Sequence, residues 1–248
     1  MPADCVDLSV VVPAYNEARR LPPYLALVRR HLEAEYPDRY EVVVVDDGSE
    51  DGLADVLAQA GAGWPQFRWI AHPQNQGKGA AVRTGVLAAL GRLVLFADAD
   101  GATPIEEERR LAEAIAHGAD VAVGSRLLAG PGVRRTRAWA RGLAGRWFAA
   151  VARRVLGLSI RDTQCGFKMF RAEAARQLFS LAREPRYLFD LEILALAVRL
   201  GYKIVEVPVN WREVPGGHLH LAHELPKVVG DLWRIRRRLR GQVIPDRH

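Results

Sequence analysis

The sequence is poor in cysteine and holds no long apolar run. Its two cysteines, Cys5 and Cys165, are too few and too far apart to indicate a disulfide framework or a zinc site, which favours a reducing cytoplasm. The best apolar run, residues 86–97, is interrupted by Arg92 and falls short of the roughly 18 residues of a membrane-spanning helix. The amino terminus, MPADCVD, carries acids before its first apolar run and does not resemble a signal peptide. We therefore expect a chain that does not cross a membrane by itself.

Acidic side chains are outnumbered by basic ones. The 248 residues carry a formal net charge of +6, which indicates an anionic partner such as nucleic acid, a phosphorylated small molecule or a membrane surface. Charged residues make up 26% of the chain and hydrophobic residues 49%, a balance typical of a globular protein. The length suits one α/β domain or two small ones.

Short apolar runs alternate with helical patterns along the first half of the chain. The run 41–45 (EVVVV) is continuous, as in a parallel strand that is buried on both faces. This alternation predicts an α/β fold with a doubly wound, mostly parallel sheet whose loops gather at one edge. We expect strands at residues 8–12, 41–45, 67–71, 93–97, 120–124 and 204–209, and a strand or turn at Met169–Phe170. Helices are expected at about residues 80–90, 104–116, 171–181 and 189–200.

Two carboxylates follow the central apolar run in the sequence LVLFADADGATP. Alternation along a strand places Asp98 and Asp100 on the same side, just beyond the carboxyl end where an open α/β sheet binds ligands. Two neighbouring acids repel unless a cation lies beside them, and hard oxygen ligands suit Mg²⁺ or Mn²⁺. A solvated turn with an acid that caps the next helix is the alternative.

Polar residues also follow three other strands: Tyr15-Asn16-Glu17, Asp46-Asp47 and Lys78. Because parallel strands end at one edge, these loops should converge with the two acids, which predicts a site for a nucleoside diphosphate. No G-x-G-x-x-G follows the first strand, and Lys78 is not followed by Ser or Thr, so neither a dinucleotide fingerprint nor a P-loop is present. A nucleic-acid binder would leave these acids without a purpose, and no helix-turn-helix signature is present.

Two basic segments carry tryptophan. Residues 126–160 hold eight arginines and no acid, and a helix over about 134–157 would place Trp139 and Trp147 on one stripe beside Arg137 and Arg141. Residues 221–248 form a second basic amphipathic segment, with Trp233 among its arginines. This composition is typical of interfacial membrane helices, although ordinary helices with solvated arginines would read alike. We expect a catalytic-type domain over residues 1–220 followed by this C-terminal helix.

The motifs VVPAYNE, VVVVDDGSEDG, NQGKGAA, DADGATP, GSR and RDTQCGFKMF stand in the order seen in family 2 glycosyltransferases. The segments RDTQCGFK and FDLE look most similar to those of dolichyl-phosphate β-glucosyltransferases, with polyprenyl-phosphate mannose synthases next. The resemblance covers about residues 8–220. It implies the GT-A fold, a nucleotide-sugar donor, a divalent cation (Mg²⁺ or Mn²⁺) and inversion at the anomeric carbon.

The resemblance also implies roles for residues around the donor. Asp98 would bind the ribose and assist the metal, Asp100 would ligate the metal, and Ala99 would contribute its backbone between them. Lys78 would lie near the base or the phosphates, or simply in solvent. The nucleoside would be held by Pro13, Tyr15, Glu17 and Asp47, with Asp47 on the base.

Further residues are implied on the acceptor side and in a late loop. Arg126, Arg137 and Arg141 resemble a cationic pocket for a lipid phosphate, to which arginine is suited by bidentate pairing. Asp190 and Glu192 would orient the acceptor or the sugar, or else cap their helix. His218 stands where the family often has a lysine, and would contact the donor phosphates when protonated or the metal when neutral.

The expected reaction is transfer of a hexose, glucose foremost, from a nucleotide sugar to a polyprenyl phosphate. Asp100, Arg126 and Asp190 are the residues we expect to act in it. Because no apolar run reaches the roughly 18 residues of a membrane span, we expect peripheral contact with the cytoplasmic face of a membrane, through the two basic segments or through a partner. Two alternatives stay open: a mannose synthase that uses GDP-mannose, and a family 2 transferase with a soluble acceptor.

Overall fold

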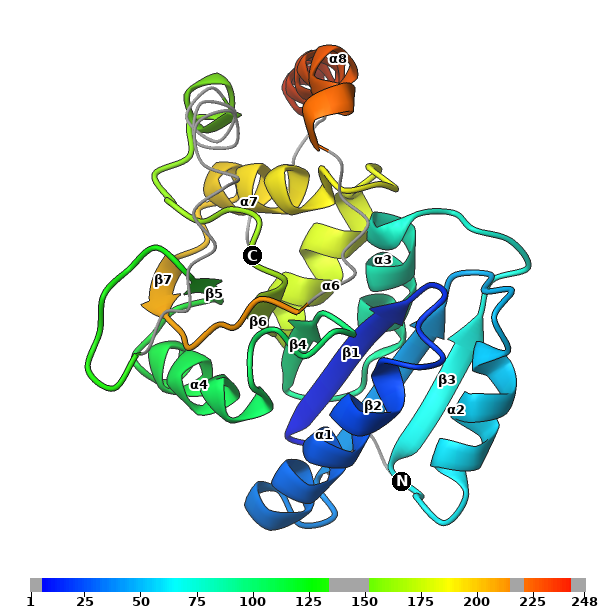
Figure 1. Cartoon of the computed structure of the whole chain (residues 1–248). Helices are drawn as coiled ribbons and strands as arrows, with labels where there is room; N and C mark the ends of the chain where they lie inside the picture. Colours follow the sequence, from blue (N-terminus) through cyan, green and yellow to red (C-terminus); the bar gives the residue numbers. More distant parts are fainter. Residues whose placement is uncertain (1–5, 134–151, 215–220, 242–248) are drawn as a thin grey trace.

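The computed structural model describes residues 6–133, 152–214 and 221–241, with side chains in the last range described from Gly230 on. A single seven-stranded sheet runs through it in the order β3-β2-β1-β4-β6-β5-β7 (Figure 1). The strands are β1 (Leu8–Ala14), β2 (Tyr40–Asp46), β3 (Phe67–Ala71), β4 (Leu93–Ala97), β5 (Val121–Ser125), β6 (Phe167–Arg171) and β7 (Ile204–Pro208).

The sheet is mostly parallel, which confirms the α/β, doubly wound arrangement predicted from the sequence. Strands β1 to β4 pair in parallel, and β5 pairs in parallel with β7. The exception is β6, which lies antiparallel between β4 and β5. The segment expected as a strand or turn at Met169–Phe170 is therefore a full strand in the middle of the sheet.

Helices cover both faces of the sheet (Figure 1). One face, which includes Val10 and Val12, packs against α1 (Leu21–Glu35), α2 (Leu53–Gly61) and α4 (Glu108–Ala116). The opposite face, which includes Val11 and Val45, packs against α3 (Lys78–Ala88), α6 (Ala172–Leu181) and α7 (Phe189–Arg199). Alternate residues of one strand thus enter two separate apolar layers, as the pleat requires.

The helix expected from Pro104 begins differently. Residues Ile105–Glu107 form a 3₁₀ turn, η2, and the α-helix α4 starts at Glu108. The cause lies in the turn itself, because Pro104 has an extended ψ of 141° and no side chain caps the helix at that point. A short 3₁₀ turn is a common way to enter an α-helix.

The C-terminal helix α8 (Leu221–Gly241) packs by one stripe against the layer that holds α6 and α7. Leu232, Ile235 and Leu239 are buried in that layer, whereas Trp233 is 57% exposed. Of the other basic segment, expected as a helix over about 134–157, residues 152–157 are described; residues 152–156 are helical and Gly157 is in a turn. Among the ranges described, no helix has both the length and the apolar character needed to cross a membrane.

Candidate functional site

Asp98 and Asp100 lie at the carboxyl end of β4, as the sequence predicts. The Asp98 backbone N–H donates to the Gly166 carbonyl at 2.9 Å, and the Lys78 ammonium lies 2.7 Å from Asp98 Oδ1. Asp100 Oδ1 accepts the Ala102 N–H at 3.0 Å. Burial, and then the negative charge of Asp98, raise the pKa of Asp100. The two carboxylates therefore act on each other electrostatically, and only Asp98 is ion-paired among the described residues.

Gly166 packs directly against the Asp98 carboxylate. A methyl group at this position would lie 2.0 Å from Asp98 Oδ2, so any side chain here would displace the carboxylate. The neighbouring Cys165 is buried, and burial raises the pKa of its thiol to about 12, so the thiol stays protonated at neutral pH. Cys165 is therefore a packed small residue of the core.

Lys78 is the first residue of α3, and close backbone contacts fix the start of that helix. Gly77 has a φ of 104°, and a methyl group on it would lie 2.5 Å from the Pro185 carbonyl oxygen. Gly79 is equally close to the Glu184 carbonyl oxygen. Burial alone would lower the pKa of Lys78, but nearby carboxylates, Asp98 foremost, outweigh burial and raise it. The lysine is therefore held as a cation beside Asp98.

A buried ion pair lies next to this cluster. Lys168 Nζ is 2.5 Å from Asp190 Oδ1 and donates to the Cys165 carbonyl at 2.5 Å. Burial raises the pKa of Asp190, and the positive charges of Lys168 and Lys78 oppose the rise. Asp190 is a site residue predicted from the sequence, whereas Lys168, three residues after Cys165 in the motif QCGFK, was not predicted.

Neither acid of the FDLE segment caps its own helix, although capping was one of the two expectations. No side chain caps the start of α7, since Asp190 pairs with Lys168. Glu192 instead accepts the backbone N–H groups of Arg183 and Glu184 and pairs with Arg238 on α8. Both carboxylates connect different elements of the fold.

Asp47 holds the segment that leads into α3. It is buried, and its carboxylate bonds the imidazole of His72 at 2.7 Å and accepts the backbone N–H groups of Gln76 and Gly77 at 3.0 and 2.8 Å. The loop after β2 thereby fixes the backbone immediately before Lys78. Asp47 and Lys78 were predicted to lie in one site, but this link between them was not predicted.

The loops after β1 and β2 are joined to each other. The Asn16 N–H donates to Ser49 Oγ at 2.9 Å, and Asn16 Oδ1 accepts the Glu50 N–H at 3.0 Å. Beside them Tyr15 is 41% exposed, Glu17 pairs with Arg20, and Pro13 is a buried residue of β1. The strand-end loops that were predicted to converge do lie together.

Arg126 follows β5 and is engaged by an acid. Its Nε and Nη2 donate to the two oxygens of Asp162 at 2.8 and 2.7 Å, and its guanidinium carbon lies 5.7 Å from the centre of the Trp211 ring. Burial alone would raise the pKa of Asp162, but the hydrogen bonds and the charge of Arg126 outweigh burial and lower it. Arg137, Arg141 and His218 fall outside the described residues, so their predicted roles stay predictions.

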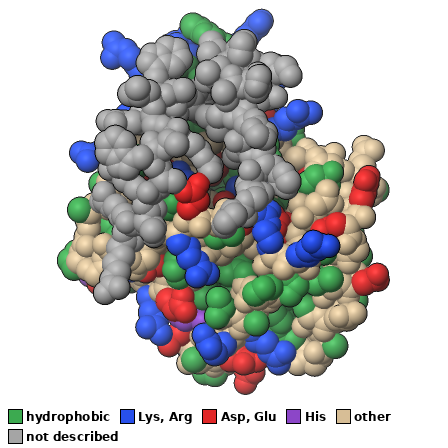
Figure 2. Space-filling model, in the orientation of Figure 1, with side chains coloured by type: hydrophobic (Ala, Val, Ile, Leu, Met, Phe, Trp, Pro, Cys, Tyr) green, Lys and Arg blue, Asp and Glu red, His purple; other side chains and the backbone are tan. Residues whose placement is uncertain are grey.

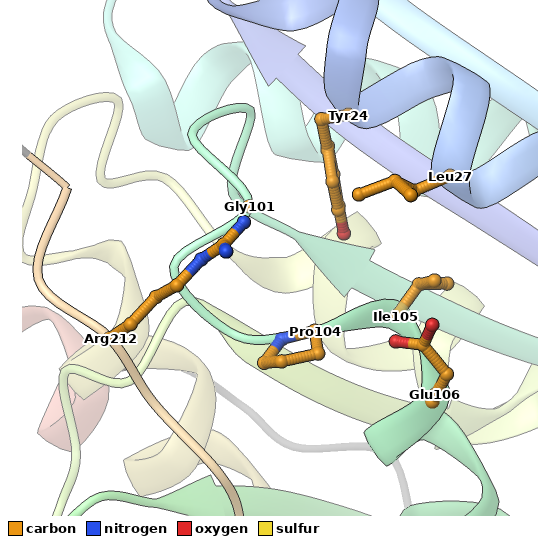
Figure 3. Close-up of a pocket in the computed structure, with 7 residues that line it drawn as sticks. All are labelled: Tyr24, Leu27, Gly101, Pro104, Ile105, Glu106 and Arg212. Carbon is orange, nitrogen blue, oxygen red and sulfur yellow. The ribbon is translucent and has the colours of Figure 1, made fainter. Parts of the chain in front are cut away.

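A cavity of about 190 Å³ lies behind the Asp98–Gly101 turn, between α1 and the segment after β7 (Figure 3). The ring of Tyr24 closes against Gly101, where a methyl group would meet it at 2.7 Å. The Tyr24 hydroxyl is buried and has no hydrogen-bond partner among the described residues. Burial and the charges of Asp98 and Asp100 raise the pKa of this hydroxyl. The Tyr24 ring therefore packs against the Asp98–Gly101 turn, and its hydroxyl stays neutral.

The acidic pair fits a divalent ion. Asp98 and Asp100 offer hard carboxylate oxygens, and a cation beside them would favour the ionised form of Asp100, which burial and the charge of Asp98 disfavour. Two carboxylates are too few to enclose an ion. Among the described residues, no group of three or more His, Cys, Asp or Glu side chains could hold a metal ion. Such a site would leave positions for substrate oxygens, as is usual for Mg²⁺.

The family follows from comparison with known proteins. The model for glycosyl transferase family 2 matches residues 9–179, and the chain belongs to this family. It is 39% identical over 239 residues to a dolichyl-phosphate β-glucosyltransferase of Trichomonas vaginalis, covering 93% of this chain and 71% of that protein. It is 37% identical to the dolichyl-phosphate β-glucosyltransferase of Saccharomyces cerevisiae, covering 93% of this chain and 74% of that one. These matches confirm that the chain is a glycosyltransferase of the kind the motifs resemble.

Solved structures confirm the fold. Glucosyl-3-phosphoglycerate synthase from Mycobacterium tuberculosis, in complex with UDP, superposes with a TM-score of 0.68 at 22% identity, covering 97% of this chain and 82% of that one. A mannosyltransferase from Pyrobaculum calidifontis, in complex with GDP-Man and Mn²⁺, gives a TM-score of 0.59 at 20% identity, covering 96% and 65%. The fold is the GT-A fold that the motifs implied.

Proposed function

We propose that this protein transfers glucose from UDP-glucose to the phosphate of a polyprenyl lipid of the dolichyl type, with inversion at the anomeric carbon. The observation that carries the proposal is the cluster of Asp98, Asp100 and Lys78 at the carboxyl edge of the sheet. Family relatives 36–40% identical over most of the chain are named dolichyl-phosphate β-glucosyltransferases, which favours this acceptor over a soluble one.

On the donor side, each strand-end loop has one task. The loop after β1, with Tyr15 and Glu17, and the buried Asp47 would hold the nucleoside. Asp98 would bind the ribose, and Lys78 would approach the diphosphate from the start of α3. Asp47 fixes the backbone before Lys78, so base recognition and phosphate contact are mechanically linked.

Asp98 and Asp100 would hold Mg²⁺ or Mn²⁺ together with the donor phosphates. The ion, when bound, supplies positive charge that neutralises the leaving nucleoside diphosphate. The protein's own contribution is to keep both carboxylates in place before the donor arrives. Gly166 and the pair with Lys78 do this for Asp98, and the Ala102 N–H does it for Asp100.

On the acceptor side, a phosphate monoester is already anionic at neutral pH, so the reaction needs no strong general base. Arg126 would orient this phosphate together with Arg137 and Arg141. Asp162 holds the Arg126 guanidinium in one orientation, which lowers the entropic cost of presenting it. Positioning and charge neutralisation would then supply most of the rate acceleration.

We also place the reaction at a membrane surface, on the cytoplasmic face. The apolar stripe of α8 faces the protein interior, which leaves Trp233, Arg234 and Arg237 on its exposed side. Exposed tryptophan among arginines suits the interface of an anionic bilayer. Figure 2 shows both acidic and basic side chains on the surface in the lower half of the view, so that part of the surface does not carry charge of a single sign.

The test is a transfer assay with radiolabelled UDP-glucose, a polyprenyl phosphate in detergent, and Mg²⁺ or Mn²⁺. We expect labelled glycolipid with either ion, none with EDTA, and at least about 100-fold slower transfer by Asp100→Asn. Asp55→Asn, which removes an exposed carboxylate on α2, is the matched control and should behave as wild type. Transfer from GDP-mannose alone, or to 3-phosphoglycerate but not to the lipid, would overturn the proposal.

A further inference from the structure

We propose that Glu192 and Arg238 are positioning residues for the donor site, through which the C-terminal helix α8 holds Lys78 in place. The proposal rests on the function proposed above only in taking Lys78 as a donor contact. Its physical content is a continuous series of contacts from α8 to Asp98, each made between described residues.

The first contact joins α8 to α7. Arg238 Nη1 lies 2.9 Å from Glu192 Oε1, and the Glu192 side chain is 1% exposed. A buried carboxylate is costly unless donors and an opposite charge surround it. Arg238 supplies that charge, although it comes from a helix more than 40 residues further along the chain.

The second contact joins Glu192 to the segment that precedes α7. Glu192 Oε2 accepts the backbone N–H groups of Arg183 and Glu184 at 2.8 and 2.6 Å. These bonds fix the path of the chain between α6 and α7. Both bonds depend on the orientation of one carboxylate, and the contact with Arg238 fixes that orientation.

The third contact joins this segment to the start of α3. The Pro185 carbonyl accepts the Ala80 N–H at 3.0 Å and lies where side chains at Gly77 would stand. The Glu184 carbonyl contacts Gly79 in the same manner. Both glycines flanking Lys78 are thus pressed against the segment that Glu192 holds.

The last contact is the ion pair between Lys78 and Asp98 at 2.7 Å. A shift of the 183–186 segment would free the first turn of α3 and let Lys78 move relative to Asp98. Neither Glu192 nor Arg238 touches that pair, so they act on it through the backbone.

The experiment compares Arg238→Met with Arg199→Met by hydrogen exchange and by calorimetric titration with UDP and Mg²⁺. Arg199 is exposed at the end of α7, so Arg199→Met changes the net charge by the same amount as Arg238→Met. We expect Arg238→Met to speed amide exchange at least about tenfold in residues 77–82 and 182–187, with β1 unchanged, and to weaken UDP binding about 3- to 10-fold. Glu192→Gln should act in the same direction, and Arg238→Lys should restore part of the protection.

Equal exchange in Arg238→Met and Arg199→Met would overturn the proposal, as would faster exchange throughout the sheet, which indicates general loosening. Faster exchange in the two segments with unchanged UDP affinity would also overturn it, because Lys78 would then not depend on them. If wild-type protein fails to bind UDP, the proposed function fails, whereas the exchange comparison still decides whether α8 holds the start of α3.

Discussion

Replacement of Lys168 by methionine is expected to destabilise the fold strongly, because it leaves a buried carboxylate without its partner. The ammonium of Lys168, which is 1% exposed, contacts Asp190 and the Cys165 carbonyl. Breaking one side of a buried ion pair costs about 3–5 kcal/mol. Lys78 remains near Asp190 and compensates part of its charge, so we expect about 3 kcal/mol in the free energy of unfolding.

The double variant Lys168→Met/Asp190→Leu separates the charge from the packing. With both charges removed, the contact between the two side chains becomes apolar, and the double variant should recover most of the lost stability. Lys203→Met, which removes an exposed lysine, should stay within about 0.5 kcal/mol of wild type. Urea unfolding followed by tryptophan fluorescence measures all four proteins.

The stability loss of Lys168→Met depends on pH, and its direction follows from the pKa of Asp190. Burial already raises the pKa of Asp190, and loss of Lys168 removes an effect that opposes the rise. Below the unfolded-state pKa of about 3.9, Asp190 is protonated in the folded and unfolded states of both proteins, so its charge contributes nothing to the stability difference. The difference appears as the pH rises above the folded-state pKa of Asp190 in the wild type, because the wild-type acid then ionises beside Lys168 and the acid of the variant does not. The deficit should therefore be smaller at pH 4.5 than at pH 7.5. A loss under about 1 kcal/mol at pH 7.5, or a double variant no more stable than the single one, would refute this reasoning.

Two further outcomes are expected. Gly166→Ala forces the Asp98 carboxylate aside and should slow sugar transfer at least about tenfold. The control Gly230→Ala, in open space on α8, should leave transfer unchanged and stabilise the helix by about 0.5–1 kcal/mol. Equal transfer activity of the two variants would contradict this account of Asp98. The protein should sediment with vesicles that contain anionic lipid and not with neutral vesicles. Trp233→Ala should reduce the fraction of protein bound to the vesicles several-fold. Vesicle binding that is insensitive to salt, or no binding, would count against the proposed membrane face.

The sheet and the position of the acidic pair follow from patterns that are local in the sequence. Continuous apolar runs of five residues, each followed by a polar loop, identify buried parallel strands, and parallel strands share one carboxyl edge. Asp98 and Asp100 can therefore be assigned to that edge from the run LVLFA alone. The same reasoning joins the loops at Asn16 and Ser49, which are bonded in the structure.

The pairings behind the site do not follow from local patterns. Lys168 meets Asp190, and Gly166 meets Asp98, because β6 inserts antiparallel between β4 and β5. Nothing in the alternation of the segment FKMFR distinguishes an inserted strand from an edge strand. The pairing of Glu192 with Arg238 depends likewise on the docking of α8, which its amphipathic pattern allows but does not direct to a particular partner.

The charges around β4 explain why the site would favour a metal ion over further lysines. Lys78 pairs with Asp98 and Lys168 pairs with Asp190, so each ammonium already has a carboxylate partner. Asp100 has no ion-pair partner among the described residues, and burial together with the negative charge of Asp98 raises its pKa. A nucleoside diphosphate would add more negative charge at the same place, and Lys78, which would contact it, already compensates Asp98. A divalent cation beside Asp100 offsets the carboxylate and the diphosphate together, whereas a third lysine would leave the diphosphate largely uncompensated.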